Sequence, residues 1–348
     1  MTSERLVLRQ PDDWHLHLRD GAALADVTPA TARVFARALV MPNLKLPVTT
    51  TAAAGAYRQR ILDALPGSTR FAPLMTLYLT DETPPAEIAR AKASGYVLAV
   101  KYYPAGATTN SASGVTAIER VLPVLEAMQA QGMVLAVHGE VTDPDVDVFD
   151  RERVFIDRTL ERIVGMFPGL RIVLEHVTTA EGVAFVTQSG PMVAATLTPQ
   201  HLMYSRNALL VGGVRPHLYC LPVLKRERHR VALVGAAVSG SPKFFLGTDS
   251  APHARHTKEH ACGCAGCYSA HAALELYADV FASAGRLNAL EDFASGFGAD
   301  FYRVPRNTGT VTLWREPWSV PSTYAFAGDE VVPLMAGETV HWRVETDQ

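Results

Sequence analysis

The sequence predicts an α/β protein that folds as a (β/α)₈ barrel. Short apolar runs recur eight times along the chain, and polar residues followed by a helix-compatible segment separate successive runs. Runs that are apolar almost throughout are typical of strands buried on both faces, as in a parallel sheet. Eightfold alternation of strand and helix favours a closed barrel, and a doubly wound open sheet is the structural alternative.

The predicted elements follow one another in the order that this fold requires. Strands are expected at residues 15–18, 38–43, 71–79, 96–103, 133–140, 171–177, 192–199 and 243–252. Amphipathic helices are expected between them, for example at 51–65, 114–132 and 157–167. From about residue 306 to 348, strand-like segments with Gly- and Pro-rich turns predict a small appendage packed on the barrel, so residues 1–348 are expected to form a single domain.

Composition and charge are those of a soluble globular protein. Hydrophobic residues make up 48% of the 348 residues, and the net charge of -3 argues against a nucleic-acid binder. The sequence has no run of about 18 apolar residues and no basic start followed by an apolar core, so neither a membrane span nor a secretory signal is expected. Of the four cysteines, Cys262, Cys264 and Cys267 lie close together, which favours a reducing cytoplasm over a disulfide framework.

Nitrogen and oxygen donors stand at the ends of most predicted strands, and in such a barrel the carboxyl ends of the strands form the mouth where chemistry occurs. These strand-end residues are His15, His17, Asn43, Lys101, His138, His176 and Asp249. Imidazole and carboxylate are good ligands for zinc, and four histidines with one aspartate exceed what a single tetrahedral ion needs. The sequence therefore predicts a site for two ions that activate a shared water.

Lys101 is the unusual member of this set, because an ammonium group would repel two dications. It closes the apolar run YVLAV, and a buried lysine tends to lose its proton. A neutral amine can combine with carbon dioxide to form a carbamate, whose two oxygens could bridge both ions. Taken singly, each donor has an ordinary explanation, such as a core histidine, a salt-bridged lysine or an N-cap aspartate. Their equivalent positions in one repeating architecture favour the metal site.

Alternation along the first strand, in the stretch DDWHLHLR (12–19), is expected to sort its side chains. The apolar residues Trp14, Leu16 and Leu18 would pack against the helices. The polar side chains between and after them would then face the barrel mouth.

The ordered set of motifs resembles a known family. The His-x-His near the N-terminus, the strand-end lysine, the single histidines and the late aspartate resemble the amidohydrolase superfamily. Within it, the chain is similar to the dihydroorotases of the short bacterial type, from about residue 5 to the AGETVHW near the end. The motifs that carry this resemblance are HLHLRDG (15–21), MPNLKLPVTT (41–50), YPAGATTNSASGV (103–115), VHGEVT (137–142), TPQHL (198–202), GGVRPHLYCLPVLK (212–225), FLGTDSAPHARH (245–256) and CGCAGC (262–267).

The resemblance implies two zinc ions per subunit in an amidohydrolase-like TIM barrel. Their ligands would be His15, His17 and Asp249 for the more buried ion, His138 and His176 for the second, and the carbamate of Lys101 as the bridge. Asp249 would also carry the proton as general base and then general acid. Tyr102 departs from the aliphatic residue expected after the lysine, which alters packing behind Lys101 but removes no ligand.

Substrate contacts are implied as well. Arg19, Asn43 and His253 would hold a carboxylate, for which a guanidinium fork is well suited. Backbone groups at Leu221 and Ala265 would meet the ring amides. Thr108 and Thr109 lie in a loop of small and hydroxylated residues that would close over the substrate as a lid.

The activity implied is reversible cyclisation of N-carbamoyl-L-aspartate to L-dihydroorotate, in the de novo pyrimidine pathway to UMP, through a hydroxide that bridges the two metals. A cytoplasmic homodimer that binds neither nucleic acid nor membrane is implied with it. Two alternatives are weighed: a hydantoinase-like enzyme acting on other cyclic amides, and a non-catalytic barrel that serves as a scaffold. The carboxylate-binding set argues against the first, and the complete ligand set argues against the second.

The cysteine cluster has two interpretations. By spacing, Cys262, Cys264 and Cys267 beside His256 and His260 could form a separate structural zinc site. The resemblance instead favours a loop on the substrate side of the pocket, with free thiols.

Overall fold

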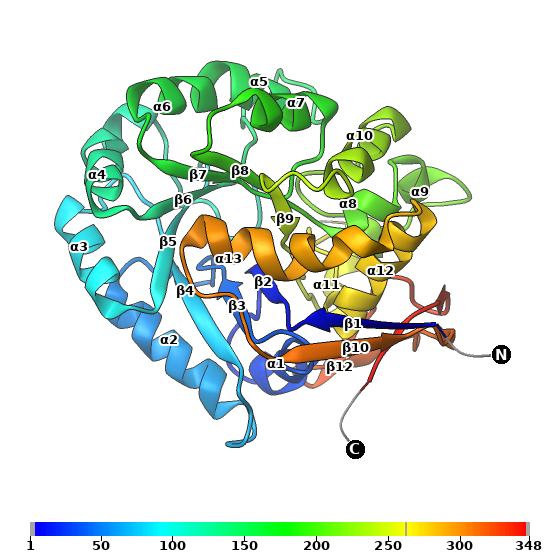
Figure 1. Ribbon diagram of the computed structural model, residues 1–348. Coiled ribbons are helices and arrows are strands. Elements are labelled where there is room, and N and C mark those ends of the chain that lie inside the picture. Colours follow the sequence, from blue (N-terminus) through cyan, green and yellow to red (C-terminus); the bar gives the residue numbers. More distant parts are fainter. Residues whose placement is uncertain (1–3, 262, 346–348) are drawn as a thin grey trace.

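The computed structural model describes residues 4–261 and 263–345, and within them eight parallel strands form one sheet in chain order (Figure 1). The strands are β2 (Asp12–Leu16), β3 (Arg37–Val40), β4 (Ala72–Tyr78), β5 (Val97–Tyr102), β6 (Val134–Val137), β7 (Arg171–Leu174), β8 (Val193–Leu197) and β9 (Phe244–Leu246). Each of them overlaps one of the eight predicted apolar runs. The prediction of a (β/α)₈ barrel is confirmed.

Helices surround this sheet on its outer side (Figure 1). They are α1 (Ala23–Ala32), α2 (Thr51–Asp63), α3 (Pro85–Ser94), α4 (Ile118–Gln131), α5 (Arg151–Phe155), α6 (Glu161–Met166), α7 (Ala180–Gln188), α10 (Glu227–Ala237) and α12 (Ala273–Ser283). Local chemistry sets their ends: the Thr50 hydroxyl accepts from the amide of Ala53 and starts α2, while Gly132, at φ 60°, ends α4. The helix predicted at 157–167 is a π-helical turn, Ile156–Leu160, continued by α6.

The first and last strands of the barrel are joined just beyond β9. Leu16 pairs with Ser250, and the amide of His17 donates to the carbonyl of Ser250 at 2.9 Å. The amide of Asp249 donates in turn to the carbonyl of His15 at 2.7 Å. Barrel closure therefore brings together two segments that lie more than 200 residues apart in the sequence.

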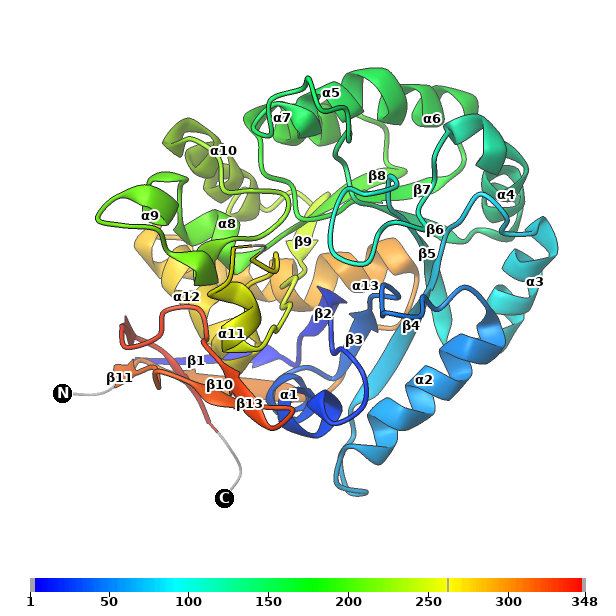
Figure 2. The ribbon, with the colours of Figure 1, turned by 180° about the vertical axis from the view of Figure 1, so that it is seen from behind.

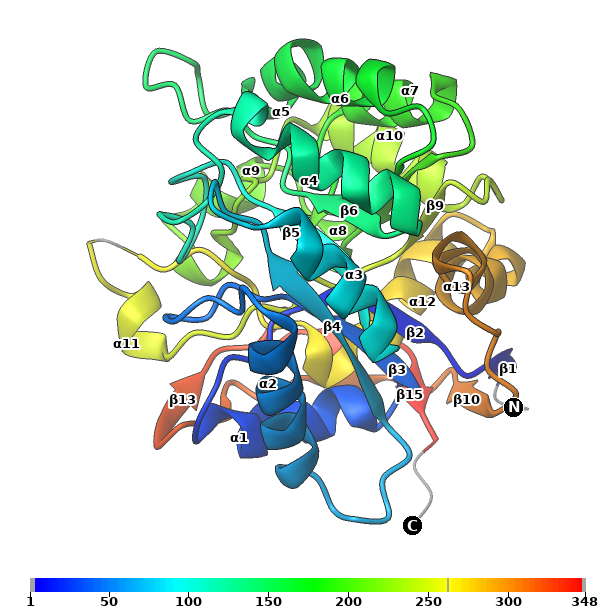
Figure 3. The ribbon, with the colours of Figure 1, turned by 90° about the vertical axis from the view of Figure 1, so that its left-hand side faces the viewer.

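The two ends of the barrel differ in what covers them. Helix α13 (Phe297–Tyr302) crosses the end nearest the viewer in Figure 1. Figure 2 looks onto the other end, where the loops after the strands carry the short helices α8 (Pro199–Met203), α9 (Asn207–Leu210) and α11 (Arg255–Lys258). The side view of Figure 3 shows α11 and α13 at opposite ends.

The expectation for Trp14 is wrong. The register of β2 shifts between Asp13 and Leu16, so simple alternation does not hold along this strand. Trp14 stacks on Tyr302 of α13, with ring centroids 4.4 Å apart, and packs inside the barrel. Leu16 and Leu18 do lie in the layer between strands and helices, as expected. The indole lies so close to α13 that a Cβ at Gly298 would come 2.0 Å from its Nε1.

The segment after the barrel forms antiparallel pairs, which confirms the predicted strands of the appendage. Strand β10 (Thr310–Trp314) lies between β15 (Arg343–Val344) and β1 (Arg5–Arg9), and the last of these was not predicted. Two further pairs are β11 (Trp318–Ser319) with β14 (Thr339–Val340) and β12 (Tyr324–Phe326) with β13 (Asp329–Val331). None of the described helices combines the length and the apolar character needed to cross a bilayer.

Candidate active site

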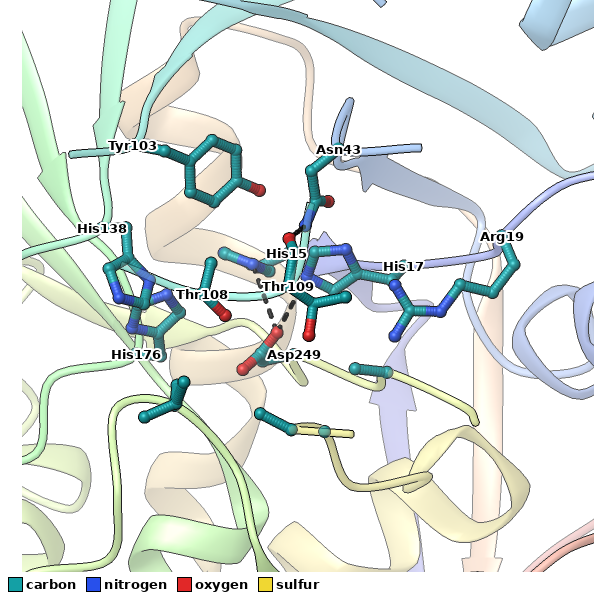
Figure 4. Close-up of a pocket in the computed structure, with 14 residues that line it drawn as sticks. His15, His17, Arg19, Asn43, Tyr103, Thr108, Thr109, His138, His176 and Asp249 are labelled. Atoms are coloured by element: carbon teal, nitrogen blue, oxygen red, sulfur yellow. Dashed lines mark hydrogen bonds and ion pairs between the residues drawn. The ribbon is translucent and has the colours of Figure 1, made fainter. Parts of the chain in front are cut away.

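A polar pocket opens at the end of the barrel opposite α13 (Figure 4). Its lining includes most of the predicted site residues: His15, His17, Arg19, Asn43, Thr108, Thr109, His138, His176, Leu221, Asp249 and Ala265. Lys101, on β5, is fully buried within the barrel. In Figure 4, His138 and His176 lie on one side of Asp249 and Arg19 lies on the other.

His15, His17 and Asp249 form one cluster, in which one ligand atom from each lies within 4.8 Å of the others. Oδ1 of Asp249 is 3.4 Å from Nε2 of His15 and 3.1 Å from Nε2 of His17. Burial alone would raise the pKa of Asp249, but its contacts with the two histidines hold it well below its usual range. Asp249 is therefore a carboxylate at neutral pH.

A buried carboxylate aligns the two chain segments of this cluster. Asp13 accepts hydrogen bonds from the amide of His15 at 3.1 Å and from the amide and hydroxyl of Thr248 at 2.9 and 2.6 Å. Burial raises the pKa of Asp13 to about 6, although these hydrogen bonds favour the charged form. Asp13 thus fixes β2 against the residue that precedes Asp249.

His138 and His176 follow β6 and β7 and form a second group on the same pocket. Their ring centroids are 4.8 Å apart, and that of His176 is 5.1 Å from that of His15. Burial lowers the pKa of His138, and burial together with Lys101 holds that of His176 well below its usual range. Both rings are therefore neutral near pH 7, which is the form of imidazole that binds metals.

The donor set fits divalent metal ions. Nζ of Lys101 and Nδ1 of His176 are buried with no hydrogen-bond partner among the described residues, which is costly unless another group satisfies them. Burial lowers the pKa of Lys101 to about 8, so a substantial share of the amine is neutral near physiological pH. Imidazoles, a carboxylate and an amine able to form a carbamate thus lie together in the mouth of the barrel.

Two buried glutamates orient the histidines, and the sequence reasoning missed both. Oε2 of Glu175 lies 2.8 Å from Nδ1 of His15 and also accepts from the hydroxyl of Thr196 at 2.5 Å. Oε2 of Glu140 lies 2.9 Å from Nε2 of His138. A carboxylate on one ring nitrogen fixes the tautomer and leaves the other nitrogen for a metal. The available signal was the placement of acids beside the histidines, in EHV and HGE.

Arg19 reaches the pocket by a different route from the one expected. β2 ends at Leu16, and Arg19 lies beyond it with φ 63°, so strand alternation does not place its side chain. Its Nε donates to the carbonyl of Pro252 at 2.9 Å. Its Nη2 lies 2.8 Å from Nε2 of His253, which is also 3.0 Å from the carbonyl of Ala265. Because burial lowers the pKa of His253 to about 2, this ring is neutral and Nε2 satisfies only one of these two contacts at a time.

The predicted lid loop rests on Asn43. Nδ2 of Asn43 donates to the carbonyl of Thr109 at 3.0 Å, and Nδ2 of Asn110 donates back to the carbonyl of Asn43 at 3.0 Å. Oδ1 of Asn43 is buried without a partner among the described residues. The loop therefore contacts a residue expected to bind substrate.

Tyr102, which stands where an aliphatic residue is expected after the lysine, lies next to Lys101 on β5. Its ring packs against Phe155 of α5, with centroids 5.9 Å apart, and so lies on the helix side of β5.

In the cysteine cluster, Cys267 is buried and Cys264 is partly exposed, while Cys262 lies outside the described residues. Among residues 4–261 and 263–345, His15, His17 and Asp249 make up the group of histidine, cysteine or acidic residues close enough to hold an ion.

Comparisons with known proteins agree with this geometry. Residues 13–320 match the model of the amidohydrolase family. A dihydroorotase from Cupriavidus necator is 62% identical over 341 residues, which cover 98% of this chain and 99% of that protein. The crystal structure of a Campylobacter jejuni dihydroorotase is 35% identical, covers 99% of this chain and 98% of its own, and superposes with a TM-score of 0.91. A Saccharomyces cerevisiae dihydroorotase in complex with 5-fluoroorotic acid is 34% identical with a TM-score of 0.90, and the match covers 99% of each chain.

Proposed function

Because this chain belongs to the amidohydrolase family and, within it, to the dihydroorotases, we propose that its barrel mouth is the active site for the reversible cyclisation of N-carbamoyl-L-aspartate to L-dihydroorotate. Dihydroorotases are hydrolases of a cyclic amide C–N bond. The observation that carries the assignment to this pocket is the meeting of a metal-binding set with a guanidinium and a buried amide in one polar cavity. Such a cavity suits a small ring that bears a carboxylate.

The metal-binding half of the pocket would hold two divalent ions, zinc being the expected metal. His15, His17 and Asp249 would hold one ion, and the pair at the ends of β6 and β7 would hold the other. The carbamate of Lys101 would join the two, which is supported by its burial and by its unpartnered amine. Bound ions would lower the pKa of a water and polarise the ring carbonyl.

Asp249 is the proton carrier in this proposal. In the hydrolytic direction it takes a proton from the attacking water and gives it to the ring nitrogen as the C–N bond breaks. Its pKa, held well below the usual range, keeps the group in its carboxylate form at neutral pH, which is the form that the proton transfer requires. In the biosynthetic direction the same carboxylate accepts the proton of the closing nitrogen. His15 and His17, at 3.4 and 3.1 Å, fix its Oδ1.

The other half of the pocket would recognise the substrate. Arg19, Asn43 and His253 would bind the carboxylate, and the backbone of Leu221 and Ala265 would meet the ring amides. The relative from Saccharomyces cerevisiae, solved with an orotic acid derivative, supports a ring of this kind. Thr108 and Thr109 would cover it, since their loop already bonds to Asn43. A cytoplasmic homodimer is proposed with this function, on the family resemblance.

Metal removal is expected to abolish turnover. The protein as purified should cyclise carbamoyl aspartate and open dihydroorotate, and chelation followed by gel filtration should lower both rates together with zinc content. Restoring Zn²⁺ should restore both rates. Metal analysis is expected to give two ions per chain, and a chelated protein that keeps its full rate would contradict the proposed metal site.

Replacing Arg19 by methionine tests recognition of the carboxylate. Loss of a buried, charge-assisted contact costs about 2–5 kcal/mol, so kcat/KM for dihydroorotate should fall by about 30- to 5000-fold. Dihydrouracil, the same ring without the carboxylate, should be processed no more slowly by the variant than by the original chain. Arg60→Met, at a more exposed arginine paired with Asp20, is the matched control and should change neither rate. Equal losses on both substrates would mean that Arg19 does not read the carboxylate.

A further inference from the structure

Lys258 is a charged side chain that is only 4% exposed. It lies at the end of α11, on the pocket side of the barrel. A buried ammonium is costly unless its donors are satisfied. Here its surroundings explain the burial and suggest a use for it.

The three N–H donors of the ammonium group all have backbone partners. Nζ donates to the carbonyl of Tyr219 at 3.0 Å, to that of Cys264 at 2.8 Å and to that of Gly266 at 2.6 Å. The last two carbonyls stand on either side of Ala265, and the first lies two residues before Leu221. Leu221 and Ala265 both line the pocket, and Lys258 therefore anchors the two backbone segments that carry them.

The two segments are also bonded to each other and to the loop after β9. The amide of Gly266 donates to the carbonyl of Tyr219 at 2.9 Å, the same oxygen that Lys258 contacts. The amide of Ala251 donates to the carbonyl of Cys267 at 2.7 Å. A Cβ at Gly266 would lie 2.5 Å from the carbonyl oxygen of Ala251, so these two segments pack too closely to admit a side chain at this position.

We propose that Lys258 is a positioning residue for substrate recognition, which sets the backbone of Leu221 and Ala265 at the spacing that the two ring amides need. It acts through these residues and does not touch the substrate. The inference rests on the proposed contacts of Leu221 and Ala265 with the ring. A hydrogen-bonding backbone pair recognises a ring only if its groups are held in place before binding.

A second lysine provides a matched control. Nζ of Lys243 also donates to three backbone carbonyls, those of Val186, Thr187 and Ser189. It lies just before β9, at the end of that strand away from the pocket. Both lysines close loops in the same way, and only Lys258 does so beside the pocket.

The test compares Lys258→Met with Lys243→Met by amide hydrogen exchange and by steady-state kinetics. Lys258→Met should accelerate exchange in peptides covering 217–222 and 263–268 by at least about tenfold, because these segments lose their common anchor. The KM for dihydroorotate should rise about 10- to 100-fold, while kcat changes by less than about threefold, as for loss of binding alone. Lys243→Met should lower the Tm and leave the exchange of both peptides and the KM unchanged. Lys258→Gln, which keeps two donors, should give intermediate values and provides a milder variant if the methionine variant folds poorly.

The possible results separate the two levels of the inference. Unchanged exchange in both peptides would overturn the positioning role of Lys258 itself. Faster exchange with an unchanged KM would show that Lys258 holds the loops but that Leu221 and Ala265 do not recognise the ring, which would overturn the proposed substrate contacts. A KM raised equally by Lys243→Met would reduce the effect to general stability and overturn the inference.

Discussion

Asp249→Ala is expected to lower kcat by at least about 10³-fold in both directions of the reaction. General acid–base catalysis by a placed side chain contributes about 10² to 10⁴, and this substitution also removes a proposed metal ligand. Asp249 is buried, and His15 and His17 both contact its Oδ1. Stopped assays with carbamoyl aspartate and with dihydroorotate, alongside zinc analysis, measure the effect.

Asp249→Asn separates the two roles. The amide keeps an oxygen for the ion but cannot carry a proton, so zinc content should fall less than in the alanine variant while kcat stays at least about 10²-fold down. Asp145 is an exposed aspartate about 100 residues before Asp249 in the sequence. Asp145→Asn therefore controls for the chemistry of the substitution and should be fully active. A zinc-loaded Asp249→Asn enzyme with ordinary kcat would refute the proton-carrier role.

The barrel and most of the pocket follow from patterns that a sequence displays directly. A strand buried on both faces has to be largely apolar, and each of the eight apolar runs overlaps a strand of the barrel. Parallel strands end on one rim, so donors at the carboxyl ends of those runs meet there, as His138 and His176 do. Neither inference needs the details of side-chain packing.

What could not be predicted depends on breaks in regularity and on distant partners. The register shift in β2 turns Trp14 inward, and the left-handed backbone at Arg19 carries its side chain to His253. Strand β1 pairs with β10, about 300 residues later in the sequence, and the local spacing of apolar residues cannot predict such a distant pairing. The assumption of regular alternation correctly predicted that His15, His17 and Arg19 lie at the mouth of the barrel. It was wrong about Arg19 in one respect, because the backbone beyond the end of β2, and not strand alternation, directs this side chain into the pocket.

The supporting polar groups were invisible for a further reason. Glu175 and Glu140 are recognised as orienting groups only when the ring nitrogen that each one contacts is known. Lys258 acts entirely on backbone carbonyls, which every residue carries, so its partners leave no trace in the sequence. Ligands can be identified by residue type, whereas the groups that hold them are identified by contact.

Formation of the proposed carbamate makes the reloading of the metal-free protein depend on carbon dioxide and on pH. Burial lowers the pKa of Lys101 to about 8, so roughly a tenth of the amine is neutral at pH 7 and half at pH 8. Because only the neutral amine combines with CO₂, reactivation by Zn²⁺ at one fixed concentration of dissolved CO₂ should be about fivefold faster at pH 8 than at pH 7 and should level off above pH 9. Reactivation in bicarbonate-free buffer should be slow at every pH.

Lys101→Met is then expected to lose at least about 10³-fold in kcat, or about 4 kcal/mol of transition-state stabilisation, together with part of its zinc. Methionine fills the buried site left by the lysine, so the loss would come from the missing bridge and not from a cavity. The Tm of the metal-free variant should match or exceed that of the metal-free original, because an unpartnered buried amine has been replaced by an apolar group. Lys243→Met, which removes a lysine remote from the pocket, should retain both zinc ions and kcat. If Lys101→Met instead held two zinc ions and kept its rate, the metals would be joined without any contribution from this lysine, and the unpartnered amine would need another explanation.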